Sequence, residues 1–372
     1  MTDPGLRLLP CLALLLGALA APAPARATPA IEPVEQLRLR PDGAGLDALD
    51  VPLGPDRLGR AMATSEFSMV GLTWSGAAGD VRIRVRSAAG WGEWRESELL
   101  DDGPDADAVE ATDRSAIDLV WVGPADGIEV AVDGATPRDL RLTLLDADAD
   151  AVDEAIAGRA AYRTGAGRKQ KRAPKPALAS RRSWGADPRL RSGRPSYVRT
   201  LQQVHVHHTV NSNDYRRSEV AGLLRGIYRY HTVNLGWSDI GYNFLVDRFG
   251  RTWVGRAGGA RRAVLGAHTL GFNSTSTGVA VIGNFDQAKP RQKVLTALVR
   301  LAAWKLDRYR RDPGGSAVVF SHGSDRHPYG ERVHLPVVDG HRDTNDTACP
   351  GQRLYDRLPG VRRRAAERVA RF

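Results

Sequence analysis

The first half of the chain repeats short runs in which hydrophobic and polar residues alternate. This period of two is typical of β-strands with one buried face, and clusters of Gly, Pro and Asp separate the runs. We therefore predict an antiparallel, all-β, sandwich-like domain over residues 28–146. The predicted strands cover residues 67–74, 81–86, 117–122, 128–132 and 140–145.

The second half combines two different periods. Residues 201–208 alternate as a strand, whereas residues 218–231 and 294–308 carry hydrophobic residues at the three- and four-residue spacing of amphipathic helices. Two further runs form a predicted hairpin around residues 247–250. Strands separated by helices indicate an α/β domain, which we place over residues 179–372.

Between these two regions lies a stretch with no hydrophobic periodicity, residues 147–178. It ends in RKQKRAPKP at 168–176, and its small, basic and proline-bearing composition predicts an exposed linker. The chain of 372 residues is also long for one domain, since a domain typically holds roughly 100–200 residues. We therefore expect two domains joined by this linker. Its charge would either tether the protein to an anionic surface or simply be solvated.

The amino terminus has the three parts of a secretory signal peptide. Arg7 precedes the apolar stretch Leu8–Ala21, and the small residues of 23–27 follow it. A membrane anchor is the other interpretation, but about 14 apolar residues fall short of the roughly 20 that span a bilayer. We expect cleavage after Ala27, a signal peptide over residues 1–27, and a protein that is secreted.

Charge is divided unevenly along the chain. Residues 28–150 hold 11 Arg and 25 Asp plus Glu, a net charge of −14. Because the whole chain carries +10 and residues 1–27 carry +1, residues 151–372 carry +23. Such asymmetry points to an anionic partner, which is nucleic acid, a membrane surface or an acidic polymer. Export argues against nucleic acid, so we expect the basic half to contact an anionic partner outside the cytoplasm.

Candidate chemistry lies in the basic half. His205 and His207 share one face of the strand predicted at 201–208. His341 and Cys349 lie eight residues apart across a turn-rich loop, and Cys349 would be the one cysteine left after signal cleavage. An unpaired cysteine is either buried and inert, a nucleophile or a metal ligand. His207, His341 and Cys349 would suit a zinc site with an open fourth position, although spacing alone does not decide between these interpretations.

Several short motifs occur together in this half, in one order. The motifs are SRRSWGA at 180–186, VHHT at 206–209, GWSDIGYNF at 236–244, GR at 255–256, GAH at 266–268, IGNF at 282–285, GHRD at 340–343 and TACPG at 347–351. On these motifs the chain resembles the family of peptidoglycan recognition proteins and type 2 N-acetylmuramoyl-L-alanine amidases over residues 180–360. The resemblance implies an α/β zinc amidase domain with a central mixed β-sheet flanked by helices. Together with the predicted export, it implies a protein that is secreted or associated with the cell wall, with anionic cell-wall polymers as a further partner.

The resemblance implies Zn²⁺ as the cofactor, with His207, His341 and Cys349 as its ligands. It also places the family's active-site tyrosine at Tyr242, and it places Thr347 at the family position two residues before the ligand cysteine. We assign both of these residues to catalysis, where they would stabilise the oxyanion or move a proton. Non-catalytic family members lack the cysteine or the tyrosine, whereas this chain has both.

The resemblance also implies a substrate preference. Family members that prefer meso-diaminopimelate stem peptides have a Gly-Trp pair followed, 19 residues after the Trp, by Arg, as Gly236, Trp237 and Arg256 are here. A guanidinium would bind the extra carboxylate of diaminopimelate, with bracing of the hairpin as the alternative role of Arg256. Three further residues would line the muramyl-peptide groove or make structural hydrogen bonds. They are His231, His268 and Asn273.

These features together predict a secreted, monomeric zinc amidase that cleaves the bond between N-acetylmuramic acid and L-alanine in peptidoglycan. The main alternative is a module that binds muropeptides without cutting them. A third hypothesis is a wall-anchoring protein whose β domain carries the main role. The acidic half shows no catalytic constellation in its sequence.

Overall fold

The computed structural model describes residues 36–77, 79–135, 137–146 and 172–372. The predicted signal peptide, its cleavage position and most of the predicted linker lie outside these residues. Among the residues that are described, no helix is long and apolar enough to cross a membrane.

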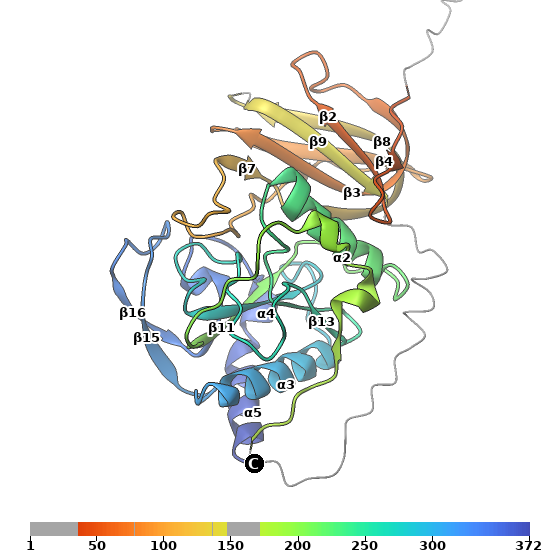
Figure 1. The fold of residues 1–372 in the computed structure, drawn as a ribbon. Coiled ribbons are helices and arrows are strands. Elements are labelled where there is room, and N and C mark those ends of the chain that lie inside the picture. Colours follow the sequence, from red (N-terminus) through yellow and green to blue (C-terminus); the bar gives the residue numbers. More distant parts are fainter. Residues whose placement is uncertain (1–35, 78, 136, 147–171) are drawn as a thin grey trace, which may run out of the picture. The chain divides into compact units, whose positions relative to one another are not determined.

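The N-terminal body is a nine-stranded β-sheet in which every pairing is antiparallel. Its strands are Arg40–Pro41 (β1), Asp47–Pro52 (β2), Met62–Ser75 (β3), Asp80–Ser87 (β4), Gly90–Trp91 (β5), Arg95–Glu96 (β6), Arg114–Ala116 (β7), Val120–Asp133 (β8) and Arg138–Asp146 (β9). Their order is β1-β2-β9-β3-β8-β4-β5, while β6 pairs with β4 and β7 pairs with β3. Figure 1 shows the long strand β3 between β9 and β8.

This body is all-β and antiparallel, as predicted, but it differs from the prediction in two ways. The predicted strands 117–122 and 128–132 are largely one strand, β8. The ladder between β8 and β3 shifts register on either side of Phe67, which lets β8 pass through Pro124, a residue without an N–H to donate. The described strands also form one hydrogen-bonded sheet, so the expected sandwich of two sheets is not confirmed.

The C-terminal body contains a mixed six-stranded sheet, which confirms the predicted α/β architecture. Its strands are Leu178–Ala179 (β10), Gln203–His208 (β11), Phe244–Val246 (β12), Thr252–Val254 (β13), Ser276–Val281 (β14) and Val338–Gly340 (β17). Their order is β10-β13-β12-β14-β11-β17. The β12–β13 pair is the predicted hairpin and is antiparallel, whereas the other pairs on this path are parallel. A separate hairpin joins Ser316–Phe320 (β15) to Arg332–Pro336 (β16).

Two of the helices around this sheet, over 220–229 and 292–308, lie where amphipathic periodicity predicted them, whereas the two helices near the end of the chain were not predicted. The helices are Val220–Arg229 (α2), Gln292–Arg308 (α3), Gln352–Tyr355 (α4) and Leu358–Val369 (α5). Helix α2 continues as a π-helical turn over Tyr230–Asn234. Figure 1 shows α3 and α5 next to each other, and their hydrophobic residues share one core cluster with Val204 and Val206 of β11.

The last residues of the predicted linker belong to the C-terminal body. Ala173 is only 4% exposed, and its N–H donates a hydrogen bond to the Asp307 carboxylate at the end of α3 (2.7 Å). Leu178 pairs with Thr252, which adds β10 to the edge of the sheet. Residues 172–178 are therefore not an exposed linker, because their few apolar side chains and free backbone groups find partners on this body.

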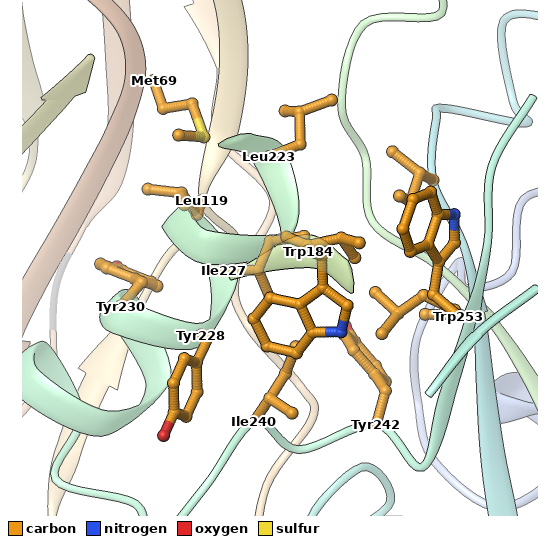
Figure 2. Close-up of a cluster of buried hydrophobic side chains, with 14 of the residues drawn as sticks. Met69, Leu119, Trp184, Leu223, Ile227, Tyr228, Tyr230, Ile240, Tyr242 and Trp253 are labelled. Carbon is orange, nitrogen blue, oxygen red and sulfur yellow. The ribbon is translucent and has the colours of Figure 1, made fainter. Parts of the chain in front are cut away.

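A hydrophobic cluster centred on α2 joins the two bodies (Figure 2). Leu223 and Ile227 of α2 lie in this cluster together with Met69 and Leu119 of the N-terminal body. On its other side the cluster extends to Trp253 of β13. The described residues accordingly belong to one compact unit.

Tyr230 makes a fully buried polar contact between the two bodies. Its hydroxyl donates hydrogen bonds to the carbonyl oxygens of Leu72 (2.8 Å) and Ile117 (3.0 Å), and its ring is fully buried. A Cβ atom at Gly71 would lie 2.4 Å from this ring, so only glycine leaves room for it. The β-sheet of the N-terminal body therefore packs against the end of α2, and hydrogen bonds from Tyr230 fix this contact.

Candidate metal site and groove

Two parallel strands bring the predicted metal ligands to one edge of the mixed sheet. Val206 of β11 pairs with Gly340 of β17, so the residues that follow them, His207 and His341, are adjacent. Cys349 returns from the next loop, and its Sγ lies 3.8 Å from Nδ1 of His207. The three ligand atoms all lie within 4.8 Å of one another. The structure thus places the three residues as a metal site requires.

Hydrogen bonds within the loop hold the cysteine in position. The Thr347 hydroxyl accepts a hydrogen bond from the N–H of Cys349 (3.1 Å), and the Cys349 carbonyl accepts one from the N–H of Arg342 (3.0 Å). The sulfur itself accepts from the N–H of His208 (3.4 Å). Thr347 therefore lies at the site, where its present contact is with the ligand's backbone.

The electrostatics of the three residues suit a metal cation. Burial lowers the pKa of His207 and of His341 to about 3, so both imidazoles are neutral at neutral pH and able to act as ligands. Burial, and then the charge of Asp102, raises the pKa of the Cys349 thiol well above its usual value. A cation beside the sulfur would favour the thiolate instead. Two neutral imidazoles and one thiolate form a donor set that zinc prefers.

His268 lies directly behind one of the ligands. Its Nδ1 is 3.1 Å from Nε2 of His207, which leaves Nδ1 of His207 to face Cys349. The second ring nitrogen of a metal-binding histidine is usually held in this way. The Asn273 amide oxygen in turn accepts a hydrogen bond from the N–H of His268 (2.8 Å). The structure buries His268 completely, and its contact with a muramyl peptide stays a prediction.

Tyr242 lies beside the ligands and between two histidines. Its ring centroid is 5.6 Å from that of His207 and 5.8 Å from that of His231. Burial raises the pKa of the phenol well above its usual value, so the hydroxyl keeps its proton. Nδ1 of His231 accepts a hydrogen bond from the N–H of Gly241 (3.0 Å). His231 thus supports the chain segment that carries Tyr242.

The residues predicted to read the stem peptide lie next to Tyr242. The N–H of Arg256 donates to the carbonyl of Tyr242 (2.9 Å), and Gly236 has a positive φ of 77° at the turn before Trp237. The Trp237 ring centroid is 4.5 Å from that of His231. Arg256 is nearly buried, at 6% exposed, and its guanidinium donates a hydrogen bond to the Ser238 hydroxyl (2.9 Å). The structure brings these predicted residues together around one site.

Three acidic side chains of the N-terminal body also reach this site, and the sequence did not reveal them. Asp102, Asp105 and Glu110 come from the segment between β6 and β7, and each contacts a predicted site residue. The segment 98–113 holds seven Asp and Glu residues and no Lys or Arg. This concentration of charge was the one signal available, and nothing along the sequence connects it to the other half.

Comparison with known families assigns both bodies. Residues 197–352 match a family described as N-acetylmuramoyl-L-alanine amidase. Residues 22–174 match a family described as Rv3811 N-terminal galactose-binding domain-like. The first match covers the strands and loops that carry His207, His341 and Cys349.

Individual relatives resemble the C-terminal body. Human N-acetylmuramoyl-L-alanine amidase is 35% identical over 188 residues, which are 49% of this chain and only 28% of the human protein. Peptidoglycan-recognition protein SA of Drosophila melanogaster is 36% identical over 140 residues, 37% of this chain and 66% of its own length. Peptidoglycan-recognition protein 1 of Holotrichia diomphalia is 34% identical over 180 residues, 48% of this chain and 78% of its own length. Since that last alignment spans most of the relative, the chain belongs to the family of peptidoglycan recognition proteins and type 2 N-acetylmuramoyl-L-alanine amidases.

Proposed function

We propose that the chain is a secreted, zinc-dependent amidase that hydrolyses the bond between N-acetylmuramic acid and L-alanine in peptidoglycan stem peptides. The observation that carries this proposal is the cluster of His207, His341 and Cys349 beside the Tyr242 hydroxyl. Similarity to an N-acetylmuramoyl-L-alanine amidase supports the reaction, and the pattern of residues 1–27 supports export.

Each residue of the site would have a separate task. Zinc, when bound by the three ligands, would supply Lewis-acid polarisation of the scissile carbonyl and activation of a water molecule. His268 would fix the tautomer and the orientation of His207. Tyr242, which keeps its proton, would donate a hydrogen bond to the carbonyl oxygen as it gains negative charge, a contribution often about 10²–10³ in rate. Thr347 would donate a second one.

The reaction is tested with purified sacculi and the zinc-loaded full chain. Prolonged incubation should release free stem peptides, detected by mass spectrometry, and a chelator should stop the release until zinc is restored. Cys349→Ala and His341→Gln should lose the bound zinc and release no detectable peptide. His334→Gln is the matched control, because it changes an exposed histidine of β16. Sacculi that are bound but never cleaved, at any zinc concentration, would establish the binding module instead.

We further propose a preference for meso-diaminopimelate stems, read by Arg256. The support is that its guanidinium, nearly buried, already binds a carboxylate, that of Glu110 (2.6 Å). Arg256→Ala should lower the rate on diaminopimelate stems by roughly 10–150-fold, because a hydrogen bond to a charged group contributes about 1.5–3 kcal/mol. The rate on lysine stems should change little. Equal losses on both stem types would contradict the preference.

A basic hollow supports the proposed contact with anionic wall polymers. It encloses about 1230 Å³ beside α3 and the segment 172–177. Nine Arg and Lys residues line it, and no acidic residue does among those that the structure describes. The lining includes Arg172, Lys175, Arg261, Arg300, Arg308 and Arg368.

A further inference from the structure

The segment that connects β6 to β7, residues 98–113, lies over the candidate site; we call it the acidic segment. Its first end is fixed to the N-terminal body, since Leu99 bridges to Ile117 and the N–H of Leu100 donates to the carbonyl of Ala116 (2.8 Å). Its other end continues into β7, which pairs with β3. Between these two ends, side chains of the segment contact the C-terminal body.

Asp102 lies against the two candidate histidine ligands. Its Oδ1 lies 2.9 Å from Nδ1 of His207 and 3.4 Å from Nδ1 of His341, and its side chain is only 6% exposed. This oxygen has no well-aligned hydrogen-bond donor, although it is buried. The other carboxylate oxygen accepts a hydrogen bond from the Tyr242 hydroxyl. One carboxylate therefore lies between a ring nitrogen of each candidate histidine ligand and the Tyr242 hydroxyl.

Asp105 and Gly103 occupy the next part of the groove. The Asn273 side-chain amide donates to the Gly103 carbonyl (2.9 Å) and to Asp105 Oδ1 (3.0 Å). Asp105 Oδ1 also accepts from the N–H of Gly271 (2.8 Å). A Cβ atom at Gly103 would lie 3.9 Å from the Trp237 ring, so the segment passes directly over this ring.

Glu110 contacts Arg256, the residue that we propose to read a substrate carboxylate. Its Oε1 lies 2.6 Å from Nη2 of Arg256, and its Oε2 accepts hydrogen bonds from the N–H (2.8 Å) and the hydroxyl (2.6 Å) of Ser238. The acidic segment thus makes, with its own carboxylates, the kinds of contact that a carboxylate-bearing peptide would make there.

With this segment in place, substrate has no access to the site. His207, His341, Tyr242 and Cys349 are between 0% and 8% exposed. Catalytic zinc sites keep three protein ligands and one open position, whereas sites with four protein ligands are closed. Cleavage of a stem peptide consequently requires that the segment first leave.

We propose that the acidic segment is an internal ligand of the amidase groove, in which Asp102 is a fourth protein ligand of the metal and Glu110 stands in for a substrate carboxylate. This inference rests on the proposed function, because it concerns the regulation of the same site. The chain is then latent at rest, and a stem peptide must displace the segment in order to bind.

The first test compares full-length, zinc-loaded variants. The double variant Asp102→Asn/Glu110→Gln should bind the free tripeptide L-alanyl-D-isoglutamyl-meso-diaminopimelate at least tenfold more tightly by calorimetry, and it should release stem peptides from sacculi at least tenfold faster. Asp107→Asn removes a charge from an exposed position of the same segment and should change neither quantity. Tripeptide affinity within twofold of that of the unaltered chain, or slower release by the double variant, would overturn the proposal.

Two further measurements separate the segment from the reaction. With Co²⁺ in place of zinc, the visible absorption bands should change in Asp102→Asn and stay the same in Asp107→Asn. Unchanged bands in both variants would show that Asp102 is not a ligand of the metal. In the unaltered chain, hydrogen exchange of residues 98–113 should be slow and should accelerate when the tripeptide saturates it. Hydrogen-exchange rates of residues 98–113 that stay the same when the tripeptide binds would refute displacement of the segment.

The outcomes also distinguish the two proposals. Suppose that the double variant binds the tripeptide more tightly but no variant releases stem peptides. This result would support the acidic segment as an internal ligand and contradict the proposed amidase activity. Equal tripeptide affinity and equal peptide release in all of the variants would support the amidase activity and contradict the acidic segment as an internal ligand.

Discussion

At the scale of single residues, the site depends on imidazoles that are both neutral and oriented. His205 and His207 share a strand face, so alternation alone could not choose between them. In the structure His205 faces Asp339 (3.4 Å) and lies outside the metal cluster, whereas His207 is held from behind by His268 (3.1 Å). The difference lies in partners that come from distant parts of the chain.

His268 is therefore predicted to act as a positioning residue. His268→Gln should weaken zinc binding by about 10–100-fold, the usual effect of removing the partner of a metal-binding histidine. Competition with a chromogenic chelator measures this, and the Co²⁺ spectrum should shift because His207 reorients. His334→Gln is the control. Unchanged zinc affinity in His268→Gln would show that His207 needs no support.

At the scale of elements, α2 and its π-helical turn connect the two sheets. The α2 residues Leu223 and Ile227 lie in the hydrophobic cluster that also contains Met69 of β3 (Figure 2). Ile117, whose carbonyl accepts a hydrogen bond from the Tyr230 hydroxyl, also bridges to Leu99 at the start of the acidic segment. The helical element that packs in the core is thus connected to the segment that lies over the candidate site.

Tyr230→Phe tests this connection without changing the volume of the core. It removes a hydroxyl that bonds two buried carbonyls, those of Leu72 and Ile117, and should lower the free energy of unfolding by about 1–3 kcal/mol. Urea unfolding measures the change. Tyr329→Phe, at a residue that is 77% exposed, should leave stability unaltered. Equal stability of Tyr230→Phe and the unaltered chain would mean that these hydrogen bonds contribute nothing net.

The elements also show what sequence could and could not predict. Period and motif were enough for α2, α3, the β12–β13 hairpin and the trio His207, His341 and Cys349, because local pattern and family resemblance determine them. The continuity of β8 through Pro124 was not predictable, since a shift in the neighbouring ladder accommodates it. The acidic segment was not predictable either, because its role comes from packing between two bodies.

At the scale of the whole molecule, part of the charge asymmetry is neutralised internally. Acidic residues of the first half meet arginines of the second, as in the pairs Glu110–Arg256 (2.5 Å) and Asp50–Arg229 (2.8 Å). The basic hollow beside α3 has no such acidic lining among the described residues. The hollow is therefore one place where a polyanion would meet several arginines and lysines together.

Binding to isolated anionic wall polymer should accordingly fall as salt rises, because the Debye length shortens from about 10 Å at 0.1 M to about 3 Å at 1 M. The double variant Arg300→Glu/Arg368→Glu should weaken cosedimentation with the polymer at low salt. Arg60→Glu makes the same kind of charge change at an exposed position of the N-terminal body and is the control. Equal losses in both variants would assign the attraction to net charge rather than to the hollow.

The attachment of the acidic segment at both of its ends has a consequence for which substrates the enzyme would accept. A ligand in the same chain is never diluted, and it acts at an effective concentration that is of order millimolar for short connections. A free stem peptide at a concentration below this effective concentration would seldom displace the segment. A wall surface that presents many stems to a protein already bound to it would reach a comparable local concentration. The enzyme would then degrade intact wall while ignoring soluble fragments.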